Sequence, residues 1–248
     1  MEEILSQIGH LSPVFVMGLG LTIGLQHAFE PDHVAAVSTQ ISKGRFAYST
    51  KQAIKTGTIR SSVLGALWGA GHTTTLMLMG LLVYGLAVKI QQNIFSSLEF
   101  VVGLMLVFLA ATTILNKKIK LTHRHPHNHY DGTIHFDEHS HNDHDHTHGH
   151  KSYLIGCIHG LAGSGSLVVL TAATMSNAIM VLGFILLFGI GSILGMTLIS
   201  GLMGLPFALS SKTPSIGRIF RYTAGALSLV IGANILYQIG FVENLFGL

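Results

Sequence analysis

Six apolar stretches, each about as long as a membrane-spanning helix, constrain this chain more than any other feature. A helix needs roughly 20 apolar residues to cross about 30 Å of hydrocarbon. The stretches of suitable length are residues 11–29, 61–87, 98–115, 153–175, 178–204 and 219–240. Only 10% of the residues are charged, whereas soluble domains carry about 25%. The sequence therefore predicts an all-α integral membrane protein with six transmembrane helices.

The basic residues indicate which loops share a side of the membrane. With six spans, 13 of the 14 Lys and Arg residues fall in the loops 43–60, 116–152 and 205–221, and only Lys89 falls on the opposite side. Cytoplasmic loops of membrane proteins are enriched in Lys and Arg. We therefore expect a multi-pass protein of the plasma membrane with these three loops in the cytoplasm and both termini outside.

The two halves of the chain resemble each other. Gly24-Leu-Gln-His27-Ala matches Gly156-Cys-Ile-His159-Gly, and Trp68-Gly-Ala-Gly71-His72 matches Phe188-Gly-Ile-Gly191-Ser192. Val102-Gly103 and Ala111 also match Ala224-Gly225 and Ala233. Each half holds three spans, so the second half would cross the membrane in the opposite sense. Inverted repeats of this kind are common in secondary transporters, which bind substrate near the midplane on discontinuous helices.

The first helix of each repeat is predicted to be broken. Pro31 lacks an amide hydrogen and disfavours helix in the residue before it, and the second repeat holds three glycines within residues 160–166. The predicted organisation is a first three-helix repeat over residues 1–115, a His-rich cytoplasmic loop over 116–152 and a second three-helix repeat over 153–248.

Ionisable residues cluster at the first break. The segment His27-Ala-Phe-Glu-Pro-Asp32-His33 places two imidazoles and a carboxylate in an apolar stretch. Such groups are costly in hydrocarbon and mark functional sites, and His with Asp suits a divalent transition metal. On a straight helix these side chains point apart, but an unwound turn at 28–31 would let them converge. We expect His27, Asp32 and His33 to bind metal; the alternative is a set of buried polar residues bonded to neighbouring helices.

Two further histidines are candidate ligands. His72 in the second span precedes three threonines whose hydroxyls could orient its ring, and a purely structural role is the alternative. His159 occupies the position of His27 in the second repeat, either as a pathway ligand or as a hydrogen-bonded remnant. Glu30 is open as a fourth ligand, an entrance charge or a helix-terminus residue. Met196 is a candidate weak ligand, although core packing is the simpler interpretation.

Eleven of the 16 histidines lie within residues 123–150, mixed with Asp and Asn. His-rich tracts bind metals through weak, exchangeable ligands. We expect this loop to be disordered and to buffer, sense or pass on metal in the cytoplasm, while a solvated spacer or an engineered tag is the alternative. Deletion of residues 123–150 is therefore not expected to affect a permease. A non-transporting metal sensor built around this loop, which is a further alternative, would lose its function.

At these residues the chain resembles the nickel/cobalt transporter (NiCoT/NicO) superfamily, especially its short six-span, UreH-like branch. The resemblance rests on His27, four residues and then Asp32-His33, and on Gly71-His72 followed by hydroxyl residues. It implies permeation of Ni²⁺ or Co²⁺ with these histidines and the aspartate as metal-binding residues. The second half departs from longer nickel permeases, because Gly163-Ser-Gly-Ser166 replaces an acidic motif and Gly195-Met196 lacks the aspartates that follow it.

The expected function is a Ni²⁺ or Co²⁺ permease, with Zn²⁺ as an alternative cargo and no resident cofactor. Membrane potential favours dication uptake by about 4.6 kcal/mol at about 100 mV, and efflux by the same fold is the alternative. An intramembrane zinc-dependent hydrolase is the rival from another class, because three protein ligands and a water form a catalytic zinc site. The expected partners are the metal ion and the lipid bilayer. Nucleic acid is not expected, because membrane topology accounts for the basic residues, and an oligomer or partner subunit is left open.

Overall fold

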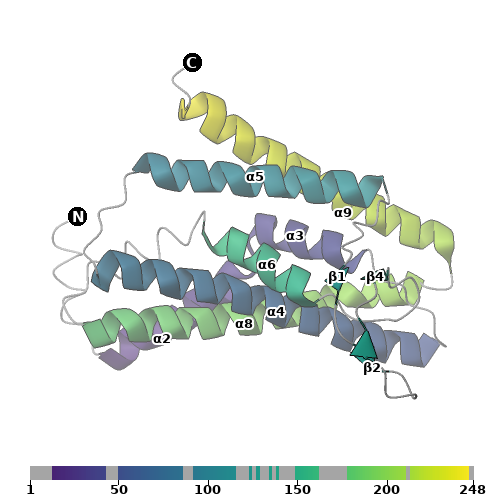
Figure 1. Cartoon of the computed structure of the whole chain (residues 1–248), viewed down its shortest axis with the longest axis horizontal. Helices are drawn as coiled ribbons and strands as arrows, with labels where there is room; N and C mark the ends of the chain where they lie inside the picture. The colour runs from purple at the N-terminus through teal and green to yellow at the C-terminus, as the bar shows by residue number, and fades with distance from the viewer. Residues whose placement is uncertain are drawn as a thin grey trace.

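The computed structural model of this chain describes residues 13–42, 50–85, 92–115, 149–161, 178–210 and 213–245, with four short strands between 123 and 139. The helices are α2 (Pro13–His27), α3 (Pro31–Ile41), α4 (Thr50–Gly85), α5 (Gln92–Ile114), α6 (Gly149–Gly160), α8 (Ala178–Leu209) and α9 (Pro214–Tyr237), and a π-helical turn, η2 (Gln238–Val242), follows α9. The helices form one elongated bundle, with most axes running along its length (Figure 1). The described part of the chain is thus almost entirely helical, as the sequence predicts.

Every predicted span overlaps one of these helices, but the boundaries differ. The helix α4 begins at Thr50 rather than near residue 61, because a polar, Lys- and Thr-containing segment continues the helix beyond its apolar part. The helix α6 ends at Gly160, the first residue of the predicted glycine-rich break at 160–166, and residues 162–166 lie outside the described part of the chain. Three helical segments are long and apolar enough to cross a membrane, namely Asn93–Ile114, Ile179–Leu209 and Ser215–Val242.

Large apolar side chains cover the outside of the bundle. Leu104 and Phe108 on α5 are 49% and 55% exposed, and Leu202 on α8 and Val230 on α9 are 58% and 67% exposed. Soluble monomers rarely expose continuous apolar surface of this kind, whereas lipid solvates it, and α-helices satisfy their own backbone hydrogen bonds in hydrocarbon. Together with the three apolar helices, this surface identifies a multi-pass membrane protein.

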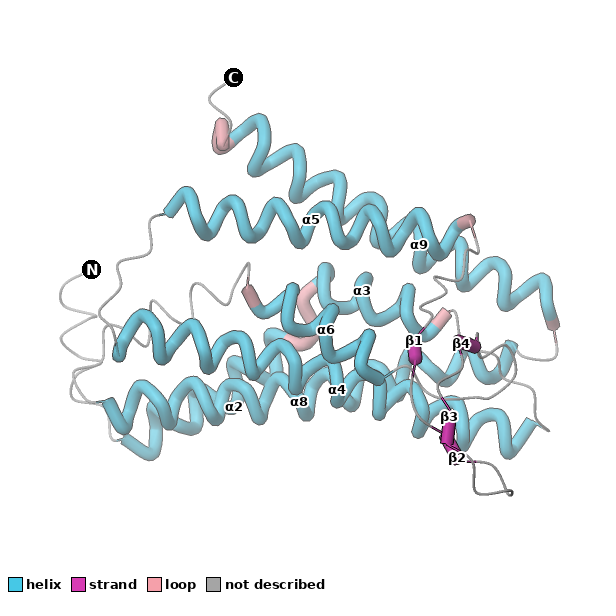
Figure 2. The backbone as a smooth tube through the Cα atoms, viewed as in Figure 1, coloured by secondary structure: helices cyan, strands magenta, loops and turns pink. Residues whose placement is uncertain are grey.

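The first span is broken where the sequence predicts. The helix α2 ends at His27 and α3 begins at Pro31, and the turn between them lies near the middle of the bundle (Figure 2). Glu30 has an extended backbone, with φ −61° and ψ 144°, as expected for a residue that precedes proline. Pro31 takes the first helical position, where an amide hydrogen has no intrahelical partner. The break therefore places His27 at one helix end and His33 in the first turn of the next helix.

The helix α3 is enclosed by the other helices. It contacts α5 and α9 on one side and α4 and α8 on the other, and Figure 1 shows it between these layers. Ala35 belongs to the apolar cluster that includes Leu106 of α5, while Val37 belongs to the cluster that includes Trp68 of α4. These two clusters anchor α3, and with it the position of His33.

Close backbone contacts join α2 to α8 and α6 to α4 in matching ways. A Cβ atom added at Gly24 would collide with the carbonyl oxygen of Phe188, and one added at Gly156 would collide with that of Trp68. The internal repeat pairs Gly24 with Gly156 and Trp68 with Phe188. The two contacts are therefore equivalent, and each half of the chain supplies the glycine in one of them. Two further pairs of contacts are equivalent in the same way. Gly71 lies against Tyr153 as Gly191 lies against Leu21, and Gly103 lies against Leu236 as Gly225 lies against Ile114.

Two short antiparallel ladders lie in the His-rich loop. The strand β1 (His123–Arg124) pairs with β4 (Glu138–His139), and β2 (His127–Asn128) pairs with β3 (Ile134–His135). The expectation of a disordered loop is therefore wrong at these four segments. The sequence between β2 and β3 contains Asp131-Gly132, a dipeptide favoured in tight hairpin turns, which the polar composition of the loop had outweighed.

Candidate metal centre

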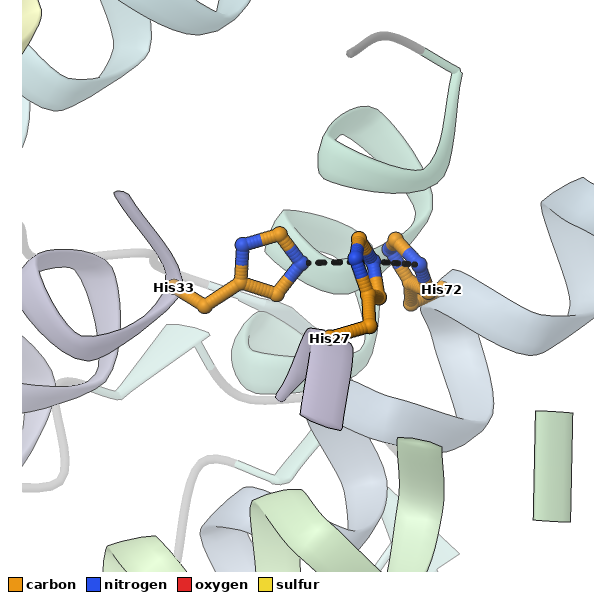
Figure 3. A group of neighbouring side chains, drawn as sticks. All are labelled: His27, His33 and His72. Carbon is orange, nitrogen blue, oxygen red and sulfur yellow. Dashed lines mark hydrogen bonds between the residues drawn. The ribbon is translucent and has the colours of Figure 1, made fainter. Parts of the chain in front are cut away.

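Three histidine side chains meet at the break between α2 and α3. The Nε2 atom of His27 lies 3.0 Å from Nε2 of His33 and 3.1 Å from Nε2 of His72. All three residues are buried, and their ligand atoms lie within 4.8 Å of one another. Figure 3 shows the ring of His27 between the other two. The centre thus joins the end of α2, the start of α3 and the middle of α4, and we call it the three-histidine centre.

A carboxylate bonds to the outer nitrogen of two of these rings. Glu30 Oε1 lies 2.9 Å from Nδ1 of His27, and Asp32 Oδ1 lies 2.8 Å from Nδ1 of His33. An ionised carboxylate can only accept a hydrogen bond, so each Nδ1 atom must donate it. In a neutral imidazole the other nitrogen then carries a lone pair. The Nε2 atoms of His27 and His33 therefore face each other as two lone pairs.

Two lone pairs at this separation repel each other unless a cation lies between them. An ion bound to Nε2 of both His27 and His33 at about 2.0–2.1 Å would have a nitrogen–metal–nitrogen angle of about 95°. This angle is close to that between neighbouring ligands in octahedral or square-planar coordination. Metal-bound histidines commonly donate their second ring nitrogen to a carboxylate, which is the arrangement found here. The three-histidine centre is therefore shaped to bind a transition-metal ion.

Asp32 lies beside the three-histidine centre rather than within it. Its Oδ1 atom bonds to His33, and its Oδ2 atom lies 2.9 Å from Nε2 of His159 on α6. Asp32, His33 and His159 form a second group whose ligand atoms lie within 4.8 Å of one another. The structure thus brings all five predicted site residues together, with Asp32 between two imidazoles. The contact between Asp32 and His159 joins the two halves of the chain and has no signal in the sequence.

The indole of Trp68 forms one wall of the site. Its ring stacks on His72, with centroids 5.6 Å apart and planes 11° apart, and it meets His33 and His159 edge-on at 5.0 Å and 5.1 Å. Trp68 is fully buried and shields these imidazoles from water. Trp68 is not among the predicted site residues, although its position four residues before His72 on a helix places both on one face and is a signal for it in the sequence.

Two expectations about neighbouring residues have different outcomes. Met196 is fully buried in the cluster that contains Trp68, in agreement with the core-packing interpretation. The expected orientation of His72 by threonine hydroxyls is wrong, because the hydroxyls of Thr73 and Thr75 face main-chain carbonyl oxygens of α8 and α6. The Nδ1 atom of His72 has no hydrogen-bond partner among the described residues.

These features define a class of protein: a multi-pass helical membrane protein in which buried histidines and partly exposed carboxylates meet at a broken helix. The family described as "Cytochrome C biogenesis protein transmembrane region" matches residues 69–234, a range that includes His72 and His159 but not the break at Pro31. The urease accessory protein UreH of Bacillus sp. (strain TB-90) is 39% identical over 233 residues, which cover 94% of this chain and 95% of that relative. The chain therefore belongs to the cytochrome c biogenesis transmembrane-region family, with UreH as a relative along almost its whole length.

Two plant relatives are more distant. Chloroplast protein FOR GROWTH AND FERTILITY 2 and chloroplast protein FOR GROWTH AND FERTILITY 1 of Arabidopsis thaliana are each 24% identical over 92% of this chain. The matched regions cover 57% and 60% of those two proteins. No solved structure matches the chain. The similarity therefore extends over nearly all of this chain but over only part of the longer plant proteins.

Proposed function

We propose that this chain is a transition-metal permease whose cargo, Ni²⁺ or Co²⁺, binds the Nε2 atoms of His27, His33 and His72. The observation that carries the proposal is the 3.0 Å approach of the Nε2 atoms of His27 and His33 at the break of a membrane-buried helix. Imidazole is a preferred ligand of nickel, cobalt and zinc, so Zn²⁺ is the alternative cargo. The metal is the transported substrate, and the proposal includes no resident cofactor.

The two carboxylates beside the centre support transport of a dication. Glu30 and Asp32 each bond to a ligand imidazole and place negative charge next to it, which raises its basicity. Their side chains are 40% and 22% exposed, whereas the histidines they contact are buried. A hydrated ion would therefore meet a carboxylate before it reached the imidazoles.

Membership in the nickel/cobalt transporter superfamily, in its short UreH-like branch, is part of the proposal. The residues that carry the resemblance, His27, Asp32, His33 and His72, are also residues that converge at the site. UreH itself is named as an accessory protein of urease. An accessory role agrees better with metal supply than with catalysis by this chain.

The proposed architecture is a six-span inverted repeat, with residues 1–115 and 153–248 as the repeats and 116–152 as a cytoplasmic loop. The exchanged glycine contacts support it, since Gly24 against Phe188 has its counterpart in Gly156 against Trp68. A binding site at the junction of two such repeats is suited to alternating access.

The proposed orientation places both termini outside the plasma membrane and the His-rich loop in the cytoplasm. Arg60 lies in the N-terminal third of α4, and Lys151 and Arg218 lie near the starts of α6 and α9, three helices that run in the same direction along the bundle (Figure 1). Positive charge favours a cytoplasmic location. A negative-inside potential would then drive the cation inward, so uptake is the proposed direction.

Metal flux into liposomes that contain only the purified protein tests this function. With a trapped metal-sensitive dye and a negative-inside potential, we expect saturable Ni²⁺ or Co²⁺ flux. His27→Ala, His33→Ala and His72→Ala should each reduce it at least about 100-fold, beyond the usual loss for an outer hydrogen-bond partner. Gln26→Ala, an exposed neighbour of His27, should retain the wild-type rate.

Two outcomes would contradict the proposal. Absence of Ni²⁺, Co²⁺ and Zn²⁺ flux in either direction, from a folded protein that binds metal, would overturn the permease and favour the zinc-dependent hydrolase. Metal flux that occurs only outward, under an applied driving force for outward movement, would overturn uptake and favour efflux by the same fold.

A further inference from the structure

We propose that a second metal position, formed by Asp32, His33 and His159, adjoins the three-histidine centre, and that the cargo ion passes between the two. This inference rests on the proposed function, because it concerns the path of the same ion. It differs from that function in assigning Asp32 and His159 as ligands of a separate position. We call this second group the aspartate position.

The aspartate position uses the opposite edge of the His33 ring from the three-histidine centre. Nδ1 of His33 lies 2.8 Å from Asp32 Oδ1, and Nε2 of His159 lies 2.9 Å from Asp32 Oδ2. The rings of His33 and His159 have centroids 4.5 Å apart. One carboxylate and two imidazoles form a recurrent ligand set for divalent transition metals. The position is therefore complete without any further residue.

His33 connects the two positions and makes them mutually exclusive. A neutral imidazole carries one ring proton and coordinates a metal through its other nitrogen, so His33 serves one position at a time. Two dications bridged by a single imidazole would lie about 6 Å apart, given metal–nitrogen bonds of about 2.0–2.1 Å, and would repel strongly in a low-dielectric interior. We therefore expect the two adjacent positions together to hold one ion.

Transfer of the ion balances the protons on the rings. When the ion binds Nδ1 of His33, that atom loses its proton and Nε2 gains one, which His27 Nε2 can accept in a hydrogen bond. When the ion binds Nε2 of His159, the proton of that ring moves to Nδ1, an atom with no hydrogen-bond partner among the described residues. Both rings stay neutral, so the transfer needs no other charged group.

The two positions also differ in exposure. The side chain of Asp32 is 22% exposed, whereas the three inner histidines are buried. Conduction requires sites that are weak or numerous enough to release the ion again. The ion would bind at the aspartate position when it moves between water and the buried three-histidine centre, since the carboxylate there can attract a hydrated dication.

Co²⁺ binding to the purified full-length protein tests the second position. Apart from the weak, exchangeable binding expected of the His-rich loop, the wild type should bind one Co²⁺ per chain tightly. His72→Gln should still bind one Co²⁺, but at least about 10-fold more weakly, with a shifted visible absorption spectrum because a carboxylate oxygen replaces a nitrogen ligand. The double variant His72→Gln/His159→Gln should bind at least about 10-fold more weakly again. In His159→Gln the side-chain amide can still donate a hydrogen bond to Asp32, which favours correct folding. Size-exclusion chromatography then shows whether the variant is folded.

The outcomes separate this inference from the proposed function. Absence of a tightly bound Co²⁺ in the wild type, with only the weak binding expected of the His-rich loop, would overturn both. Loss of all binding in His72→Gln, or equal affinities of the single and double variants, would overturn the aspartate position alone. In liposomes, His159→Gln should slow Co²⁺ flux at least about 10-fold while Gln26→Ala does not, and unchanged flux in His159→Gln would also overturn it.

Discussion

The Nε2 atom of His27 lies 3.0 Å from the Nε2 atom of His33, and the far nitrogen of each ring bonds to a carboxylate, Glu30 or Asp32. This pairing depends on the turn between α2 and α3, because on a continuous helix the two histidines would point in different directions. Pro31 ends the first helical segment and starts the second. A single proline in the sequence thus supplies the geometry on which the proposed metal binding depends.

The carboxylates are expected to control metal affinity without binding the ion in the three-histidine centre. Glu30→Gln should weaken Ni²⁺ binding about 10-fold, and Asp32→Asn should weaken it up to about 100-fold, the range for lost partners of ligand histidines. Asp32→Asn has the larger expected effect because Asp32 bonds to the imidazoles of both His33 and His159, whereas Glu30 bonds to that of His27. Isothermal titration calorimetry in detergent measures both, and wild-type affinity in both variants would contradict the assignment.

Trp68 is expected to report metal binding directly. It is the only tryptophan in the chain, and its ring stacks on His72. Ni²⁺ and Co²⁺ have partly filled d shells and should quench its fluorescence, whereas Zn²⁺, with a filled d shell, should not quench it by the same route. His72→Gln should shift the Ni²⁺ titration to at least about 10-fold higher concentration, and Gln26→Ala should leave it unchanged. Quenching that is equal in the wild type and His72→Gln would place the metal elsewhere.

The glycines at the contacts between α2 and α8 and between α6 and α4 are expected to be essential for packing. Gly24→Ala and Gly156→Ala should each destabilise the protein by about 1–3 kcal/mol, the usual cost of overpacking, because each added methyl group would meet a backbone carbonyl. Gly18→Ala is the matched control, since a Cβ there meets nothing within 4 Å. Thermal unfolding followed by size-exclusion chromatography measures the effect, and equal stability of Gly18→Ala and Gly24→Ala would contradict the close approach.

The proposed orientation can be tested with single cysteines. In a Cys157→Ser background, Asn93→Cys at the start of α5 should react with a membrane-impermeant thiol reagent on intact cells. Thr213→Cys, just before α9, should react only after the membrane is permeabilised. Both positions are exposed. The reverse labelling pattern would indicate the opposite orientation in the membrane. It would contradict both the cytoplasmic location of the His-rich loop and the proposed driving force for uptake.

Much of the fold could be predicted because lipid imposes simple rules on sequence. Apolar length located the helices, and Pro31 located the break. Boundaries were less predictable: the polar start of α4 at Thr50 continues the helix past its apolar part, so hydropathy does not detect it. The ladder between β1 and β4 is not expected from the sequence, because the His-rich, polar composition of this loop is typical of disorder.

The site was predictable in its membership but not in its arrangement. The spacing of His27 and His33 around a proline indicated convergence, and chemistry indicated a metal. The bond from Asp32 to His159 spans 127 residues and depends on how α3 packs against α6, which no local pattern encodes. The sequence alone predicts Asp32 as one more ligand of a single ion, whereas the structure places it between two imidazoles.

X-ray absorption spectroscopy at the metal edge tests the central claim most directly, on protein loaded with less than one Ni²⁺ per chain so that the tighter membrane site fills before the weakly binding His-rich loop. The account predicts a nitrogen shell at about 2.0–2.1 Å with the scattering of three imidazoles, falling to two in His72→Gln and staying at three in Gln26→Ala. A shell made only of oxygen, or an imidazole number that does not change in His72→Gln, would contradict metal binding by His27, His33 and His72.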